Sequence, residues 1–210
     1  MPPFLPVSKC SRSPYEQAAM KTLKDLSAEH HSEGIIMHGT GRDPVREALK
    51  RHEERQEQNI IILIRQLSDS NPNLRTRSAE SLGNMGDLRA VEPLIALLDD
   101  PVPDVVWVAL RALGKLRGPL AYDHLIQRLT NPDRWIRQGA AWALGELRDP
   151  RAGLSIVPLL SDKKKGVRAA AAEALGKIGG GPYREQLEPL LDDEEPEVRQ
   201  AAREAMKKSE

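Results

Sequence analysis

The chain has 210 residues, and its 31 Lys and Arg side chains balance its 31 Asp and Glu side chains, so the formal net charge is zero. A neutral chain is atypical of proteins that neutralise a nucleic-acid backbone or lie on an anionic membrane. The single cysteine, Cys10, excludes an internal disulfide framework and favours a cytoplasmic location. Few aromatic residues and abundant Ala, Leu, Arg and Glu predict an all-helical protein, and no apolar run approaches the ~20 residues of a membrane span.

Residues 1–41 differ in character from the rest of the chain, because they hold four early prolines and a polar loop rich in His and Gly. We expect this segment to be a flexible extension in which Ser13 caps a short helix through about Ala28. The loop could supply metal ligands, namely His30, His31, Glu33 and His38. Zinc needs a fixed tetrahedral geometry that such a loop does not provide, so we expect no metal site.

Residues 42–67 are predicted to form a capping helix, or two helices with a break near Gln58. Asp43 followed by Pro44 is typical of a helix start, with Asp as N-cap and Pro at the first helical position. The first part, Arg46–Gln58, is charged on all sides and is expected to project into solvent. The last part carries four apolar residues in the register of a buried helix face: Ile60, Leu63, Ile64 and Leu67.

Residues 68–206 contain an internal repeat of 31 residues. Four blocks follow one another without a gap and half a block ends the series: 68–98, 99–129, 130–160, 161–191 and 192–206. Numbered from 1 to 31, position 7 is always aliphatic, position 11 always small, and positions 7, 11, 14, 15 and 18 follow the spacing of a buried helical face. A second apolar group at positions 23, 27, 28 and 31 predicts another short helix. Each block is therefore a helical hairpin, and stacked hairpins form an α-solenoid.

Position 16 is glycine in all four complete blocks: Gly83, Gly114, Gly145 and Gly176. Glycine adopts the left-handed backbone conformation at the least cost, so we interpret this position as the point where the first helix of each hairpin stops.

The repeats resemble the HEAT-like repeats described in phycobilisome lyases, and the 31-residue consensus of engineered arrays derived from them. The stretches GVRAAAAEALGKIG, in 161–178 and the glycine that follows, and DLRAVEPLIALL, in 87–98, carry the resemblance. It covers about residues 59–206 and implies the solenoid fold. It does not imply one function, because members of this family serve as scaffolds, adaptors and lyase subunits.

Charged side chains recur at two positions of the repeat. Position 8 holds Arg75, Arg137, Arg168 and Arg199, and position 2 holds Asp69, Asp100, Asn131, Asp162 and Asp193. We interpret these as structural: the Asp or Asn suits a loop and N-cap, and the Arg bridges to the loop of the next repeat, as the resemblance also implies. Val106 interrupts the Arg series in the second block, which predicts a more apolar joint there.

All three tryptophans fall in the two central blocks, at positions beside the predicted buried face: Trp107, Trp135 and Trp142. In the engineered arrays that the chain resembles, positions 5, 6, 9, 10, 13 and 17 form the concave surface. That register also places Val108, Arg111, Arg134, Gln138 and Glu146 around the tryptophans. Trp and Arg are enriched at binding hot spots, so we predict a partner-binding patch; the alternative is that one or more of the indoles pack between repeats.

The main hypothesis is therefore a non-catalytic scaffold or adaptor that binds a protein partner on its concave face, with no cofactor and no metal. No catalytic constellation is visible, and the one His-Glu pair, His52-Glu53, lies outside the repeats. An alternative is a phycobilin lyase or tetrapyrrole chaperone, in which indoles and Arg111 or Arg134 hold a planar ligand. Nucleic-acid binding through tryptophan stacking is a third reading, and the neutral charge weighs against it.

Overall fold

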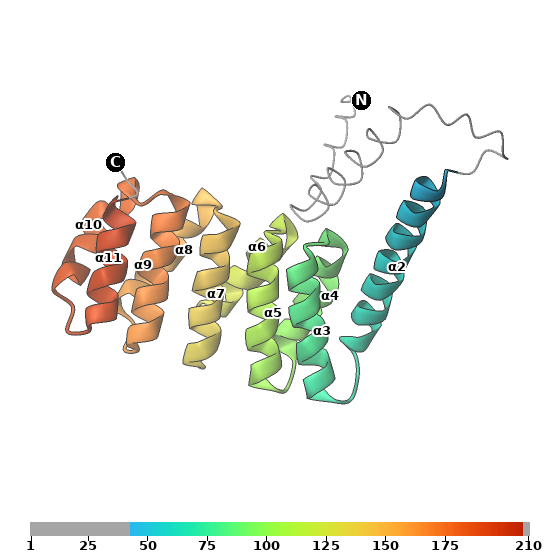
Figure 1. Cartoon of the computed structure of the whole chain (residues 1–210). Coiled ribbons are helices and arrows are strands. Elements are labelled where there is room, and N and C mark those ends of the chain that lie inside the picture. The colour runs from blue at the N-terminus through green and yellow to red at the C-terminus, as the bar shows by residue number, and fades with distance from the viewer. Residues whose placement is uncertain (1–42, 208–210) are drawn as a thin grey trace, which may run out of the picture. The chain divides into compact units, whose positions relative to one another are not determined.

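A computed structural model describes residues 43–207, and every regular element in this range is helical (Figure 1). The expected helix from Ser13 and the histidine-rich loop lie outside the described residues. By its residue contacts the chain divides after Glu57 into two units.

Helix α2, Pro44–Gln66, is continuous, so the break that the sequence allowed near Gln58 is not present. Asp43 begins the helix as predicted, because its Oδ1 accepts a hydrogen bond from the Val45 amide at 3.0 Å. The residues of α2 that belong to the second unit supply apolar side chains to the core of that unit: Ile60 is buried, and Leu63 and Ile64 pack against the same core.

The predicted hairpins are confirmed. Five longer helices begin the four hairpins and the final half-block: α3, Pro72–Met85; α5, Pro103–Leu116; α7, Arg134–Leu147; α9, Lys165–Gly179; and α11, Pro196–Lys207. The second helices are short: α4, Val91–Ala96; α6, Tyr122–Arg128; α8, Gly153–Ile156; and α10, Arg184–Leu187. Short 3₁₀ turns flank them at Leu88–Ala90, Leu97–Asp99, Pro119–Ala121, Pro150–Ala152, Val157–Ser161, Gly181–Tyr183 and Glu188–Asp192.

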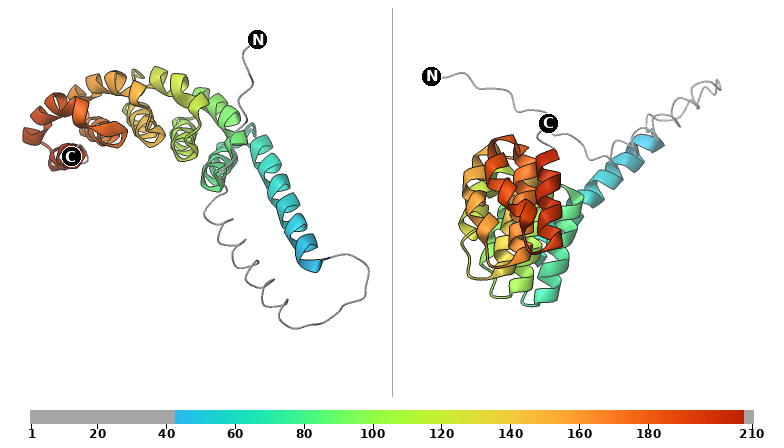
Figure 2. Two further views of the ribbon diagram at one scale, coloured as in Figure 1. Left: turned by 90° about the horizontal axis from the view of Figure 1, so that it is seen from above. Right: turned by 90° about the vertical axis from the view of Figure 1, so that its left-hand side faces the viewer.

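The repeat array has two layers. Helices α3, α5, α7, α9 and α11 lie side by side in one layer and α4, α6, α8 and α10 form the other (Figure 1). Viewed from above, the array curves, with the layer of longer helices on its concave side (Figure 2). The fold is therefore the α-solenoid that the repeat predicts, and it presents one face of each longer helix to the concave surface.

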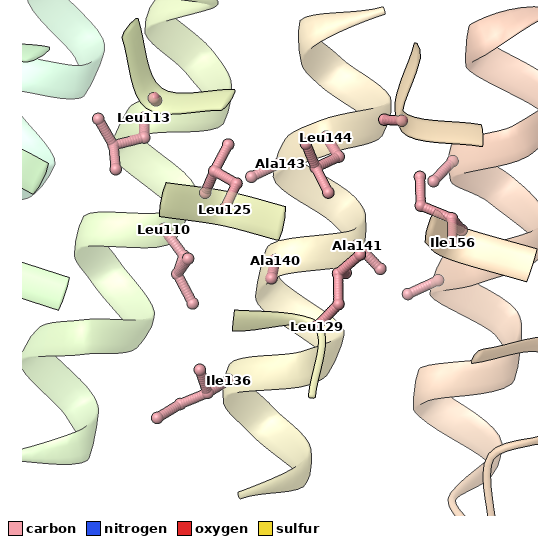
Figure 3. Close-up of a cluster of buried hydrophobic side chains, with 14 of the residues drawn as sticks. Leu110, Leu113, Leu125, Leu129, Ile136, Ala140, Ala141, Ala143, Leu144 and Ile156 are labelled. Carbon is pink, nitrogen blue, oxygen red and sulfur yellow. The ribbon is translucent and has the colours of Figure 1, made fainter. Parts of the chain in front are cut away.

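The core runs between the layers. Figure 3 shows its central part, where Leu110 and Leu113 of α5 and Leu144 of α7 meet Leu125 of α6. All four side chains are fully buried. Small residues at position 11 are also buried throughout, so each helix can approach its neighbour closely, as the spacing predicted.

The interpretation of the position-16 glycines as helix stops is wrong. Each lies inside its helix, with one residue or more of helix still to follow. A Cβ atom added to Gly145 would lie 2.7 Å from the Ala174 Cα atom, and one added to Gly83 would lie 2.8 Å from the Ala112 Cα atom. The glycines are needed because neighbouring helices almost touch there, at a distance that leaves no space for a side chain.

The helices reverse three residues later, at position 19. The residues there have positive φ, of 76° at Gly86, 52° at Arg117, 56° at Arg148 and 118° at Gly179. Two of these four are arginines, which adopt this conformation at a cost that glycine does not have. A search for glycine alone therefore finds the wrong position for the helix end.

The predicted bridge between repeats is confirmed at three joints: Arg75 with Asp100, Arg137 with Asp162, and Arg168 with Asp193. Arg137, for example, donates from Nε and Nη2 to the two carboxylate oxygens of Asp162 at 2.8 and 3.0 Å, and from Nη1 to the Asn131 carbonyl oxygen at 2.8 Å. Burial raises the pKa of the Asp162 carboxyl, but the hydrogen bonds from Arg137 and the Lys164 amide outweigh it and lower that pKa below its usual value.

The joint between the second and third repeats lacks this bridge, as predicted from Val106. That side chain is buried, and the position opposite it in the next repeat holds Asn131 in place of aspartate. The loss of the arginine is thus accompanied by the loss of the carboxylate, which would otherwise have no counterion in a partly buried place.

Candidate functional site

The three tryptophans lie together on the concave surface, Trp107 on α5 and the other two on α7. The rings of Trp107 and Trp135 meet edge to face, with their centroids 6.1 Å apart and their planes at 71°. Trp135 is the most accessible, with 50% of its surface exposed, and Trp107 and Trp142 are more deeply buried than Trp135. The structure therefore brings Trp107 against Trp135, and the partial burial of Trp107 and Trp142 agrees with the alternative of packing between repeats.

Two glycines leave the space that the half-buried indoles of Trp107 and Trp142 occupy. A Cβ atom added to Gly139 on α7 would lie 2.9 Å from the ring of Trp107, and one added to Gly114 on α5 would lie 2.7 Å from the ring of Trp142. Each of the two helices thus extends an indole across a glycine of the other. The rings contribute to the joint between α5 and α7, and each keeps part of its surface accessible.

A groove with a volume of about 390 Å³ opens beside these rings. Four predicted site residues line it, namely Trp107, Arg111, Gln138 and Trp142. The other lining residues come from the next repeats: Gly166, Ala169, Ala170, Glu173 and Glu197. Helices α5, α7, α9 and α11 all contribute, so the groove exists only in the stacked array.

The remaining predicted residues lie around this groove. The Arg134 guanidinium stacks on the Trp135 ring at 4.5 Å from its centroid. Val108 is half-buried and packs against the core, so it stabilises the array and offers little surface to a partner. Glu146 does not line the groove either, and it joins two basic side chains of neighbouring repeats.

The charge on Glu146 is satisfied within the array. Its carboxylate accepts hydrogen bonds from Arg117 at 3.0 Å and from Lys177 at 2.7 Å. Burial raises the pKa of the Glu146 carboxyl, but these two bonds outweigh that effect and lower the pKa below its usual value. Lys177 also lies 5.6 Å from the centroid of Trp142 and so links Glu146 to the indole. Glu146 is therefore a positioning residue for the rim of the groove.

Sequence reasoning missed the half of the groove on α9 and α11. Gly166, Ala169, Ala170 and Glu173 occupy positions 6, 9, 10 and 13 of the fourth block, and Glu197 is at position 6 of the last. Positions 6, 9 and 13 are the ones that carry the tryptophans in the central blocks. Small residues and glutamates are common on any helix, so the repeat register was the one signal that could have found them.

Within residues 43–207 no group of His, Cys, Asp and Glu side chains could hold a metal ion. Among the same residues, no helix has the length and apolar character needed to cross a membrane. The groove itself is lined by aromatic surface, one guanidinium, one amide and two carboxylates.

Comparison with known proteins places these features in a family. The family of HEAT repeats matches residues 60–144 and 122–207. The complex of CpcE and CpcF of phycocyanin lyase from Nostoc sp. PCC7120 contains a similar structure, with a TM-score of 0.66, 30% identity, and 71% of this chain covered. The match spans 64% of the lyase chain.

Two designed proteins share the fold at lower identity. An engineered protein matches with a TM-score of 0.59 and 20% identity over 96% of this chain and 95% of its own. A designed armadillo repeat protein, solved in complex with the peptide (KR)4, matches with a TM-score of 0.55 and 18% identity over 94% and 95%. No curated protein matches the sequence significantly.

Proposed function

Since the chain belongs to the HEAT-repeat family, we propose that it is a non-catalytic scaffold or adaptor that binds a protein partner on the concave face of its solenoid. It would do so in the cytoplasm and without a cofactor. The observation that carries the proposal is the groove of about 390 Å³ with two half-buried indoles in its wall and a third, Trp135, exposed beside it.

The physical argument is that rigid aromatic surface is the commonest anchor of protein interfaces. Indoles lose little conformational entropy on binding. An indole that already packs against a glycine of the neighbouring helix loses less still, because its side-chain conformation is restricted before binding. Trp107 and Trp142 are held in this way by the neighbouring helix. An exposed indole beside them enlarges a surface that water solvates poorly.

The test compares two exposed side chains, Trp135 in the layer of longer helices and Leu154 in the layer of shorter helices. The full-length protein, tagged for recovery, is used to capture its partner from lysate of its source, as the wild type, as Trp135→Ala and as Leu154→Ala. Leu154 lies on α8 in the other layer and is 78% exposed. We expect Trp135→Ala to weaken the affinity of the captured partner about thirtyfold, equivalent to about 2 kcal/mol, and Leu154→Ala to leave it unchanged.

Melting temperatures keep the result interpretable, because a half-exposed ring contributes less to folding than a buried one. We expect both variants to melt close to the wild type. Equal retention of the partner by Trp135→Ala and the wild type would contradict the proposal, and so would the absence of any stoichiometric protein partner.

A second candidate function is that of a lyase-like or chaperone subunit for a linear tetrapyrrole. The similarity to the phycocyanin lyase complex favours it, and a groove of this volume is within the range of small-molecule sites. Titrating a linear tetrapyrrole into the wild type and into Trp142→Ala would test it. A shifted absorption band that depends on Trp142 supports pigment binding, and an unchanged spectrum leaves the protein-partner function as the better one.

A further inference from the structure

One row of side chains crosses the groove at the same repeat position. Arg111 on α5, Trp142 on α7 and Glu173 on α9 are all at position 13 of their blocks, so they lie at one height on three neighbouring helices. Helices packed in this way are about 8–10 Å apart, which separates the Arg111 and Glu173 backbones by roughly 16–20 Å. The row therefore has a cation at one end, an indole in the middle and an anion at the other end.

The two charges at the ends of the row are available to a ligand. Arg111 and Glu173 are both exposed, and neither forms an ion pair or a side-chain hydrogen bond that involves another residue of the described range 43–207. Glu197, by contrast, already has Lys165 at 3.5 Å. The groove thus contains one free positive and one free negative group, on opposite sides of Trp142.

The α9 side of the groove suits an extended backbone. Ala169 and Ala170 have small side chains, so a chain can approach α9 closely there. Gly166 makes room for the Gln138 side chain instead, because a Cβ atom added to Gly166 would lie 2.7 Å from Gln138 Oε1. The Gln138 amide carries a donor and an acceptor, like a peptide group, and makes no hydrogen bond to any other side chain of the described part.

We infer that this groove binds an extended segment of the partner protein with an acidic side chain opposite Arg111, a basic side chain opposite Glu173, and apolar side chains between them on the indoles. The inference rests on the proposed function and names the partner's chemistry. A strand rises about 3.3 Å per residue, so the two charges are about six residues apart. Alternate residues share one face, so the apolar residues are the second and fourth after the first charge.

The probe is the synthetic peptide Glu-Ser-Leu-Ser-Leu-Ser-Lys with blocked ends, titrated into the full-length protein while tryptophan fluorescence is recorded. Two matched peptides carry Glu at both ends or Lys at both ends. We expect the wild type to bind the mixed-charge peptide about tenfold more tightly than either matched peptide, because each replacement exchanges an attraction for a repulsion at an exposed site.

Charge reversal in the protein supplies the crossed control. Arg111→Glu should come to prefer the peptide with Lys at both ends, and Glu173→Lys the peptide with Glu at both ends, each again by about tenfold. Neither residue has a partner in the described part of the chain, so both variants should melt like the wild type. Ala169→Phe should fill the groove and abolish binding of all three peptides, while Ala169→Ser should not.

Failure of the inference is distinct from failure of the proposed function. Equal affinity for the three peptides, no crossed preference, no measurable peptide binding, or a helical circular-dichroism signal from the bound peptide would each overturn the inference. Loss of partner capture in Trp135→Ala would still support binding at the concave face in every one of those cases.

Discussion

The position-16 glycines provide the most direct test of how the repeats pack. In Gly145→Ala the new Cβ atom would lie 2.7 Å from the Ala174 Cα atom and 2.9 Å from its Cβ atom. Carbon atoms are in favourable contact at about 3.5–4.0 Å, so α7 and α9 would have to separate by about 0.8 Å or more. The obstacle is the backbone of a neighbouring helix, which cannot rotate away as a side chain would.

Two opposing effects set the magnitude. Overpacking of this kind costs about 1–3 kcal/mol, whereas replacing glycine by alanine inside a helix contributes about 1 kcal/mol in favour of folding. We expect the free energy of unfolding to fall by about 0–2 kcal/mol, with about 1 kcal/mol as the central value. It is measured by urea denaturation of the full-length chain, followed by far-ultraviolet circular dichroism. An increase of about 1 kcal/mol would refute the close approach, because helix propensity would then be the only effect.

A paired variant identifies where the helix really ends. Arg148→Gly relieves a residue that has φ of 56° and should raise the free energy of unfolding by about 0.5 kcal/mol. If Gly145 were the stop instead, Arg148→Gly would bring no gain. Destabilisation by the first variant together with stabilisation by the second is expected only from the packing described above.

Two further predictions concern the joints between repeats. Folding lowers the pKa values of the Asp100 and Asp162 carboxyls, so their stabilising effect is complete well above the unfolded value of about 3.9. It is lost progressively as the pH falls from about 5 through the lower pKa values of the folded state. The free energy of unfolding should therefore drop over this acidic range, and it should drop less in Asp162→Asn. At the joint without a bridge, Val106→Arg and Asn131→Asp should each lower the free energy of unfolding when made alone. In the double variant the two effects should compensate, with a coupling free energy of about 1–3 kcal/mol measured by urea denaturation. Additive effects would show that no bridge forms.

The sequence by itself determined the architecture. A period of 31 residues, with apolar side chains at helical spacing in two groups, can bury its apolar surface only as stacked hairpins. It also determined the arginine bridges, because Arg137 and Asp162 recur at fixed repeat positions and meet wherever the repeats stack regularly. The missing bridge at Val106 followed from the same register.

The candidate site was predictable only in part. The tryptophans and Arg111 stand out by residue type, and the repeat register places them on one surface. Glu173 and the small residues of α9 do not stand out, because nothing local distinguishes them from other helical residues. They acquire a role only when α9 lies beside α7 and completes the groove.

Only the tertiary structure decided how closely the helices approach. The sequence could not tell a glycine that ends a helix from one that admits a neighbour, since both are single glycines near the end of an apolar pattern. The distance from Gly145 to Ala174, and the seating of Trp142 on Gly114, depend on contacts between residues about 30 positions apart. Periodicity reports the face on which a side chain lies, whereas the space available to it is set by the neighbouring helix.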